Sequence, residues 1–419
     1  MDRCMSIIVI ILMLFPAGSS AQSLEVSGSY RGEFEMLEQD SSYRHQQWMN
    51  LQFDRSFGMK ASMRMNLEFN TYDYDRTRPF FREAYVNYYT SNIDWRFGKQ
   101  IISWGSAYKI KPTDYFNPYD FTTLMPGDRR TGITAVSAIL YGPARTEVSG
   151  VVTPFFNEHL LEPQTENKLF NLNLDQTVRT LDQNIPYFSV RLDSANRYYH
   201  HEPEANLSNT QGGLKLTKRG LVGVDISISG YHGRDKLVAI DERKTSGSVS
   251  YVPGTPPQVD SLATVYFFYP QVNRYGLDMI GSAGGVGLWL ELVQNQYHKD
   301  QFNDNLSIVA GADYKFSSDL YLVMQGMVIE ARDATLDDVQ ALMLHLTRPV
   351  FNFHEIELTG MYDFQNDSYL VQPQLNFSFA DAVTLGFGGT LLDMSGHPYR
   401  PLMTELIADR IYTRLSVDF

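Results

Sequence analysis

The sequence has almost no cysteine and no long hydrophobic run. Its one cysteine, Cys4, lies in a segment that we expect to be removed, so the mature chain should have no disulfide and no thiolate metal site. Beyond that segment, no apolar run approaches the roughly 18 residues of a transmembrane helix. A basic excess is missing too: 35 basic residues face 48 acidic ones, which excludes the charge pattern of a typical nucleic-acid-binding protein.

The first 21 residues are predicted to be a secretory signal peptide. Arg3 gives a positive start, and the apolar segment of residues 7–15 is too short to span a bilayer. Ser19 and Ala21 are the small residues of a cleavage site. A buried N-terminal helix is the alternative, but no amphipathic segment follows. We therefore expect an exported protein.

Residues 22–419 are predicted to form one domain, because no linker, charge block or low-complexity stretch divides them. Their composition is mildly polar, with a mean hydropathy of −0.27 for the whole chain. An exported, undivided and mildly polar chain fits one membrane class, the outer-membrane β-barrel, which hides its hydrophobicity in alternate residues.

Alternation of apolar and polar residues predicts the strands of this barrel. In residues 57–70 the apolar side chains lie on one face, and the polar ones, Lys60 to Asn70, lie on the other. Strict alternation over about ten residues is longer than the usual soluble strand and matches a tilted bilayer span. About eighteen strands are predicted, and sixteen is the alternative. Their ranges are 24–36, 45–54, 57–70, 80–90, 93–102, 131–142, 144–156, 210–218, 221–233, 264–281, 285–298, 306–316, 319–331, 339–350, 353–364, 367–379, 382–392 and 408–419.

The connections support this count, because every second link in such a barrel is a short periplasmic turn. Those links are tight and several contain turn-forming residues, as at Ala283 and Gly284. The other links are generally longer, among them residues 103–130 and 157–209. Residues 187–192 also alternate, but a strand there would reverse the parity, so we place them within the loop 157–209. The sequence predicts an all-β, closed antiparallel transmembrane β-barrel with long external loops.

The C-terminal segment IYTRLSVDF places Ile411, Leu415, Val417 and Phe419 on one face and ends on an aromatic residue. It resembles the C-terminal signal that the outer-membrane barrel assembly machinery reads. We therefore expect Phe419 to be an assembly signal, that machinery to be a partner, and outer-membrane lipids and lipopolysaccharide to surround the protein.

The third external loop, residues 103–130, is long and rich in aromatic residues. Loops of this length are usually functional or disordered, and disordered segments contain few aromatic residues. We therefore expect the loop to fold into the lumen and pack on the inner wall. The alternative is an external lid on neighbouring loops.

A family resemblance rests on this loop. The motif consists of a Gly-Lys-Gln strand end, a Trp-Gly pair and a Phe-Asn-Pro element, at Gly98, Lys99, Gln100, Trp104, Gly105, Phe116, Asn117 and Pro118. It resembles a porin-like family of proteobacterial outer-membrane barrels whose substrates are mostly unknown, with a more distant similarity to alginate-export barrels. The resemblance implies passage of a solute without naming it.

One set of residues is predicted to meet that solute, and a second set is predicted to line the lumen, where most of its charges are expected to be hydrated and paired across strands. The first set, proposed as a constriction with aromatic faces and charges for a small polar or amphiphilic molecule, is Trp104, Tyr108, Lys109, Lys111, Asp114, Tyr115, Phe116, Asn117, Tyr119 and Asp120. Within it, Asn117 is expected to shape the turn. The second set, on the lumen-facing side of the strands, is Arg31, Glu33, Lys60, Arg64, Glu68, Arg96, Glu355 and Glu357.

Other functions remain as alternatives. A surface receptor or adhesin would also have large external loops. An outer-membrane lipid-modifying enzyme would need a catalytic constellation, and no G-x-S-x-G or HExxH motif is present. The pair His200-His201 lies near acidic residues, but we expect surface histidines there. We predict no catalytic residue, no metal site, no cofactor and no nucleic-acid partner, and leave open the solute, its direction and the oligomeric state.

Overall fold

The computed structural model describes most of the chain. Its described residues are 24–37, 43–72, 76–120, 129–159, 197–201, 203–204, 206–237, 239–240, 249–250, 258–259, 264–299, 301–332, 338–351, 353–393 and 409–419. The predicted signal peptide, residues 1–21, and the alternating segment 187–192 lie outside them.

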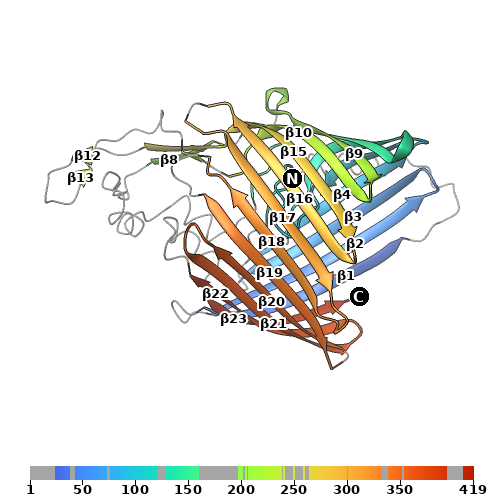
Figure 1. Cartoon of the computed structure of the whole chain (residues 1–419), viewed down its shortest axis with the longest axis vertical. Coiled ribbons are helices and arrows are strands. Elements are labelled where there is room, and N and C mark those ends of the chain that lie inside the picture. Colours follow the sequence, from blue (N-terminus) through green and yellow to red (C-terminus); the bar gives the residue numbers. More distant parts are fainter. Residues whose placement is uncertain are drawn as a thin grey trace.

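Within the described residues, eighteen strands form one closed antiparallel sheet (Figure 1). They are β1 (Glu25–Leu37), β2 (Tyr43–Phe57), β3 (Ala61–Tyr72), β4 (Arg76–Tyr89), β5 (Ile93–Gln100), β6 (Ile133–Gly142), β7 (Thr146–Thr153), β9 (Gln211–Leu221), β10 (Val224–Arg234), β15 (Gln271–Ala283), β16 (Val286–Tyr297), β17 (Asn305–Lys315), β18 (Tyr321–Ile329), β19 (Val339–Val350), β20 (His354–Asp363), β21 (Ser368–Ala380), β22 (Val383–Asp393) and β23 (Arg410–Asp418). Each strand pairs with the next one along the chain, and β1 also pairs with β23. The predicted closed eighteen-stranded barrel is confirmed, and the sixteen-stranded alternative is wrong.

The closing seam is held by side chains as well as by the backbone. Along it, Ser29 faces Asp418 and Leu37 faces Arg410. In addition to the backbone hydrogen bonds, the Glu33 carboxylate accepts a hydrogen bond from the Arg414 guanidinium at 2.6 Å. The ladder continues to Phe419, whose N–H donates to the Gly28 carbonyl at 2.9 Å and whose carbonyl accepts from the Gly28 N–H at 2.7 Å.

Polarity is inverted across the wall of the barrel. Apolar side chains on one face of the strands are exposed, as shown by Val26 at 57%, Ile228 at 56% and Met324 at 47%. Polar side chains on the other face are buried, including Glu33 at 1% and Gln325 at 0%. An apolar outer band and a polar interior are the pattern of a barrel surrounded by lipid.

The two ends of the barrel differ in their connections. At one end, here called the short-turn end, the connections contain two to five residues. Gly284 and Gly285 form one of these turns with φ of 58° and 84°, a left-handed backbone that glycine adopts readily. Lys60 lies in another, between β2 and β3, and is exposed. The prediction that Lys60 lines the lumen is therefore wrong, because the strand begins one residue later. The opposite end, the long-loop end, carries the connections 101–132, 154–210 and 235–270.

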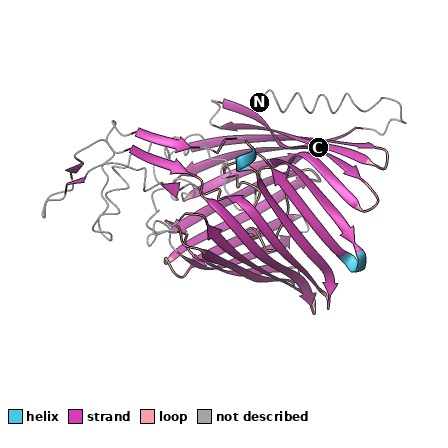
Figure 2. Cartoon of the chain, turned by 90° about the horizontal axis from the view of Figure 1, so that it is seen from above, coloured by secondary structure: helices cyan, strands magenta, loops and turns pink. Residues whose placement is uncertain are grey.

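Short strands extend the fold at the long-loop end (Figure 1). β14 (Thr264–Phe268) pairs with β8 (Arg197–His201) and β11 (Ala239–Ile240), and β12 (Val249–Ser250) pairs with β13 (Gln258–Val259). The expected single strand 264–281 is thus divided, because Pro270 cannot donate to a ladder and β15 begins after it. Figure 2 shows in cyan the 3₁₀ turns η1 (Pro143–Arg145) and η2 (Leu207–Asn209). Among the described residues, no helix is long and apolar enough to cross a membrane.

Candidate functional site

The connection between β5 and β6, residues 101–132, is here called the inner loop, and it binds side chains of distant strands. Its described residues contact β10, β15, β16, β18 and β19, all from the second half of the chain. The contacting strand residues alternate with lipid-facing ones, so they belong to the inward face. The inner loop therefore lies against the inside of the wall.

Glu291 on β16 is the centre of this attachment. Its carboxylate accepts hydrogen bonds from the backbone N–H of Ala107 at 2.7 Å, the N–H of Thr113 at 2.9 Å and the Thr113 hydroxyl at 2.7 Å. Gly105 has a φ of 86°, and a Cβ there would stand 2.7 Å from a Glu291 oxygen. The Trp-Gly pair of the motif thus needs its glycine to let the backbone approach the carboxylate.

A second attachment lies on β18. Gln325 accepts from the Tyr108 N–H at 2.9 Å and donates from its amide nitrogen to the Tyr108 carbonyl at 2.9 Å, as a neighbouring strand would. Trp289 also donates to Gln325 at 2.9 Å. The ring of Tyr108 lies 5.3 Å from that of His345 on β19. Ser106 adds a hydrogen bond to Asp278 on β15.

Three predicted ligand-facing rings are buried instead. Trp104, Tyr115 and Phe116 are 4%, 1% and 2% exposed. Trp104 packs edge-on against Tyr115 and Phe116, and Phe116 packs edge-on against Tyr231 of β10. The Tyr115 hydroxyl lies 3.0 Å from that of Ser229. The expectation that these three rings offer flat faces to a solute is wrong, because burial of large apolar area against the wall is what fixes the loop.

The middle of the inner loop is braced by Asn117. Its side-chain oxygen accepts from the Ile102 N–H at 2.9 Å, and its nitrogen donates to Asp114 at 2.6 Å. Asp114 also pairs with Arg130 at 3.0 Å, and only 6% of its side chain is exposed. Burial raises the pKa of Asp114 despite the nearby Arg130 guanidinium. Asp114 thus holds the loop together and presents little charge to the lumen.

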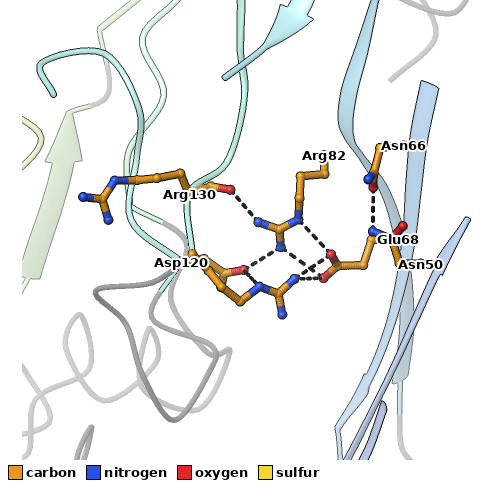
Figure 3. Close-up of polar contacts among 7 residues, drawn as sticks. Asn50, Asn66, Glu68, Arg82, Asp120 and Arg130 are labelled. Atoms are coloured by element: carbon orange, nitrogen blue, oxygen red, sulfur yellow. Dashed lines mark hydrogen bonds and ion pairs between the residues drawn. The ribbon is translucent and has the colours of Figure 1, made fainter. Parts of the chain in front are cut away.

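The far end of the inner loop is tied to β3 and β4 by a buried charge cluster (Figure 3). Arg82 donates to Glu68 at 2.8 Å and to Asp120 at 2.8 Å, and Arg129 donates to Glu68 at 2.5 Å. Arg82 is the extra residue of a β-bulge, since its neighbours Phe81 and Glu83 pair with consecutive residues of β3. Glu68 faces inward as predicted, but the inner loop covers it and it is 1% exposed. Asp120 is 0% exposed, so the expectation that it faces a solute is wrong.

The remaining loop residues of the predicted set are more accessible. Lys109 and Lys111 are half-buried, and the Lys109 ammonium lies 5.4 Å from the ring centre of Tyr108. Tyr119 is also half-buried, with the Arg130 guanidinium 3.3 Å from its ring centre. Its N–H donates to His159 at 2.9 Å.

The inward face of β1 to β3, β5 and β20 carries charged side chains that are partly exposed. The Arg31 side chain is 28% exposed and pairs with Glu33 at 3.1 Å, and Arg64 is 41% exposed and pairs with Asp54 at 2.7 Å. Arg96 on β5 donates to Asn87 at 2.8 Å. On β20, Glu357 accepts from Asn376 at 2.7 Å, and Glu355 is half-buried beside it. Charged side chains are thus partly accessible on this side of the inward face.

Sequence reasoning missed the wall residues that hold the loop. The sequence does not indicate which residues Glu291, Gln325 and Arg82 contact. It does indicate that Glu291 needs a partner. In GVGLWLELV, Glu291 is the one charged residue of an otherwise apolar run. A charge at an inward position among apolar residues needs a partner, because an unpaired buried charge is costly.

Replacing Glu291 by alanine should release the inner loop without opening the barrel. Two backbone N–H groups and one hydroxyl would lose their acceptor, at about 1–3 kcal/mol for each buried group. We expect single-channel recordings of Glu291→Ala to fluctuate between two levels. Glu357→Ala on β20 is the matched control, because it removes a carboxylate that contacts Asn376 and should leave the current steady. If Glu291→Ala gives the same steady current as the parent protein, this carboxylate does not hold the loop.

No protein-family model matches the sequence, and no curated protein does so. Among solved structures, a loop-deletion mutant of OmpT, an outer membrane protein of Vibrio cholerae, is 11% identical over 95% of this chain and 99% of its own, with a TM-score of 0.43. A mutant of Rh. blastica porin is 11% identical over 95% of this chain and 100% of its own, with a TM-score of 0.41.

The chain's own strand pairing and inverted polarity decide its class. An even number of antiparallel strands, a closed ring and an apolar outer band characterise bacterial outer-membrane barrels. The chain is an outer-membrane β-barrel.

Proposed function

We propose that this barrel is a porin-like channel for small polar or amphiphilic solutes. The observation that carries the proposal is that the inner loop leaves part of the inward wall uncovered. The loop binds side chains of β10, β15, β16, β18 and β19 and, at its far end, Glu68 of β3 and Arg82 of β4. Arg31 on β1 and Arg64 on β3 remain partly exposed. Eighteen strands enclose an aqueous lumen unless loops fill it. A solute would pass between the loop and the charged side of the wall.

The motif of the inner loop supports membership of the porin-like family that it resembles. Gly105 permits the approach to Glu291, Phe116 packs on Tyr231, and Asn117 braces the turn. The motif residues thus position the constriction rather than touch the solute. Residues Lys109 and Lys111 are then the loop charges closest to the path.

Purified refolded barrel should give stable single-channel currents in planar bilayers, with steps of uniform size. Heat-modifiable migration on gels checks that the protein inserted is folded. A folded barrel that inserts and carries no current would refute the channel and favour a receptor or an enzyme.

A further inference from the structure

The outward face of β10 and β15 changes from apolar to polar toward the long-loop end. Ile228 of β10 lies opposite Leu277 of β15, and further along the same ladder His232 lies opposite Asn273. Alternation places all four side chains on one face, and Ile228 is 56% exposed on it. The apolar band that meets lipid therefore ends before His232, which lies on a polar rim.

Two histidine rings meet on this rim. The ring centres of His232 and His298 lie 5.7 Å apart, with 41° between the ring planes. His298 follows β16 directly, and its N–H donates to the Gln271 carbonyl at 3.2 Å, which continues the ladder of β15 and β16. Gln271 is also opposite Arg234, which shares the outward face of β10 with His232. Both histidine side chains therefore face outward, and both are exposed.

Asn273 determines which nitrogen of His232 is available. The Nδ1 atom of His232 lies 2.8 Å from Oδ1 of Asn273. An amide oxygen only accepts, so Nδ1 carries the proton and Nε2 keeps its lone pair. In the part of the chain that the structure describes, no hydrogen-bond donor reaches Nε2, and the His298 side chain has no hydrogen-bond partner. A polar group that holds one ring nitrogen and leaves the other available is typical of metal-binding histidines.

The separation of the two rings suits one shared metal ion. Two imidazoles with Zn–N bonds of about 2.0–2.1 Å at a tetrahedral angle place their ring centres about 5.2 Å apart. The observed separation is about 0.5 Å larger, a difference that rotation of two exposed side chains removes. Imidazole nitrogen is a preferred ligand of Zn²⁺, Ni²⁺ and Cu²⁺, whereas Mg²⁺ and Ca²⁺ prefer oxygen.

The neighbouring charges do not create this preference. The guanidinium of Arg234 donates to a backbone carbonyl at 2.8 Å, and the ammonium of Lys299 lies 3.7 Å from the centre of a phenylalanine ring of β14. The carboxylate of Asp304 accepts from the backbone N–H of the residue before His298 at 3.0 Å. Two cations and one carboxylate do not attract a cation, so affinity must come from metal–nitrogen bonds.

We propose that His232 and His298 bind one divalent transition-metal ion, such as Zn²⁺, on the outward rim of the barrel, with water completing its coordination. Asn273 is a positioning residue for His232. The ion would join β10 to β16 across β15, behind the part of the wall whose inward residues Ser229 and Glu291 contact the inner loop. The site faces away from the lumen, so the inference does not depend on the proposed channel.

Calorimetric titration of the untagged folded barrel in a non-ionic detergent with ZnCl₂ tests the site. We expect one Zn²⁺ per chain. His232→Gln and His298→Gln should each weaken binding at least tenfold, because a single imidazole remains. Asn273→Ala should weaken it about tenfold, as loss of a group that orients a ligand does. MgCl₂ should show no saturable binding, because the site offers nitrogen and not oxygen.

His354→Gln is the matched control. It removes one imidazole from the start of β20, at the short-turn end, where the ring lies 5.1 Å from that of Phe377. This variant should bind Zn²⁺ like the parent protein.

The temperature at which the folded barrel loses its fast migration on gels gives a second readout. Zn²⁺ should raise it in the parent and in His354→Gln, because an ion that binds only the folded state stabilises that state. It should not change it in His232→Gln or His298→Gln. Without Zn²⁺ all variants should match the parent, which checks that they fold.

The absence of saturable Zn²⁺ binding by the parent would overturn the inference. So would equal losses in His354→Gln and the two rim variants, or equal affinity for Mg²⁺. A loss confined to one of the two rim histidines would show that a single imidazole binds the ion, and the shared site would then be wrong.

Discussion

Replacing residues 106–119 by a short Gly/Ser linker should roughly double the single-channel conductance or more, because an eighteen-stranded lumen is wide when no loop narrows it. The segment carries the inner-loop bonds to Glu291 and Gln325, so its removal uncovers the inside of β16 and β18. The barrel should still close, since closure rests on backbone pairing of β1 with β23. Conductance in planar bilayers and heat-modifiable migration measure the two effects.

A matched variant separates the size of the loop from its charge. The double substitution Lys109→Gln with Lys111→Gln keeps the loop and should leave conductance near the parental value while shifting ion preference toward cations. Asp114 is unsuited to this comparison, because its replacement would break its bonds to Asn117 and Arg130. If the linker variant conducts like the parent, the loop does not limit the current and the constriction is elsewhere.

Replacing Phe419 by aspartate should leave most of the protein unassembled. Phe419 exchanges two backbone hydrogen bonds with Gly28 across the closing seam, and a Cβ at Gly28 would stand 2.6 Å from its ring. The ring therefore covers the glycine at the point where the last strand meets the first. The yield of heat-modifiable barrel in outer-membrane fractions measures the effect.

Phe379→Asp is the control for this substitution. Phe379 is an exposed aromatic residue near the end of β21, at the same end of the barrel as Phe419. A charge on the lipid face near the membrane boundary costs only about 0–1 kcal/mol, so this variant should assemble. Equal yields from the two variants would show that Phe419 acts as an ordinary rim aromatic and not as an assembly signal.

The strands could be predicted from the sequence because their pattern is local. Lipid and lumen impose opposite polarity on alternate residues, so β21 and β3 show their two faces in the residue order itself. The prediction failed at strand ends, where apolar and polar residues continue to alternate beyond the last residue that is hydrogen-bonded in the sheet. Lys60 keeps the alternation but lies in a turn, and Phe268 alternates into β14 although Pro270 separates it from β15.

The site was predicted less well because its contacts are not local. Aromatic content indicated that the inner loop must pack, but the residues that pack are then hidden, as Tyr115 and Phe116 are. Alternation tells which residues of a strand face inward, yet it does not tell which distant strand a loop will meet. Glu291 could be assigned as an inward charge, whereas Arg82 faces inward only because of the bulge in β4, and the partners of both follow only from the closed geometry.

The hydrogen bonds that hold the inner loop also determine when the loop can reach its final position. Ser106 to Asp278, Thr113 to Glu291 and Tyr108 to Gln325 span 172, 178 and 217 residues of sequence. The loop is made early in synthesis, but its docking surface exists only after β15 to β18 have joined the sheet. Contacts of such long range form late, since the chain must first lose the entropy of closing the intervening segment. Docking of the inner loop is therefore a late step of biogenesis, and a barrel trapped before that step would have a closed sheet with its inner loop undocked.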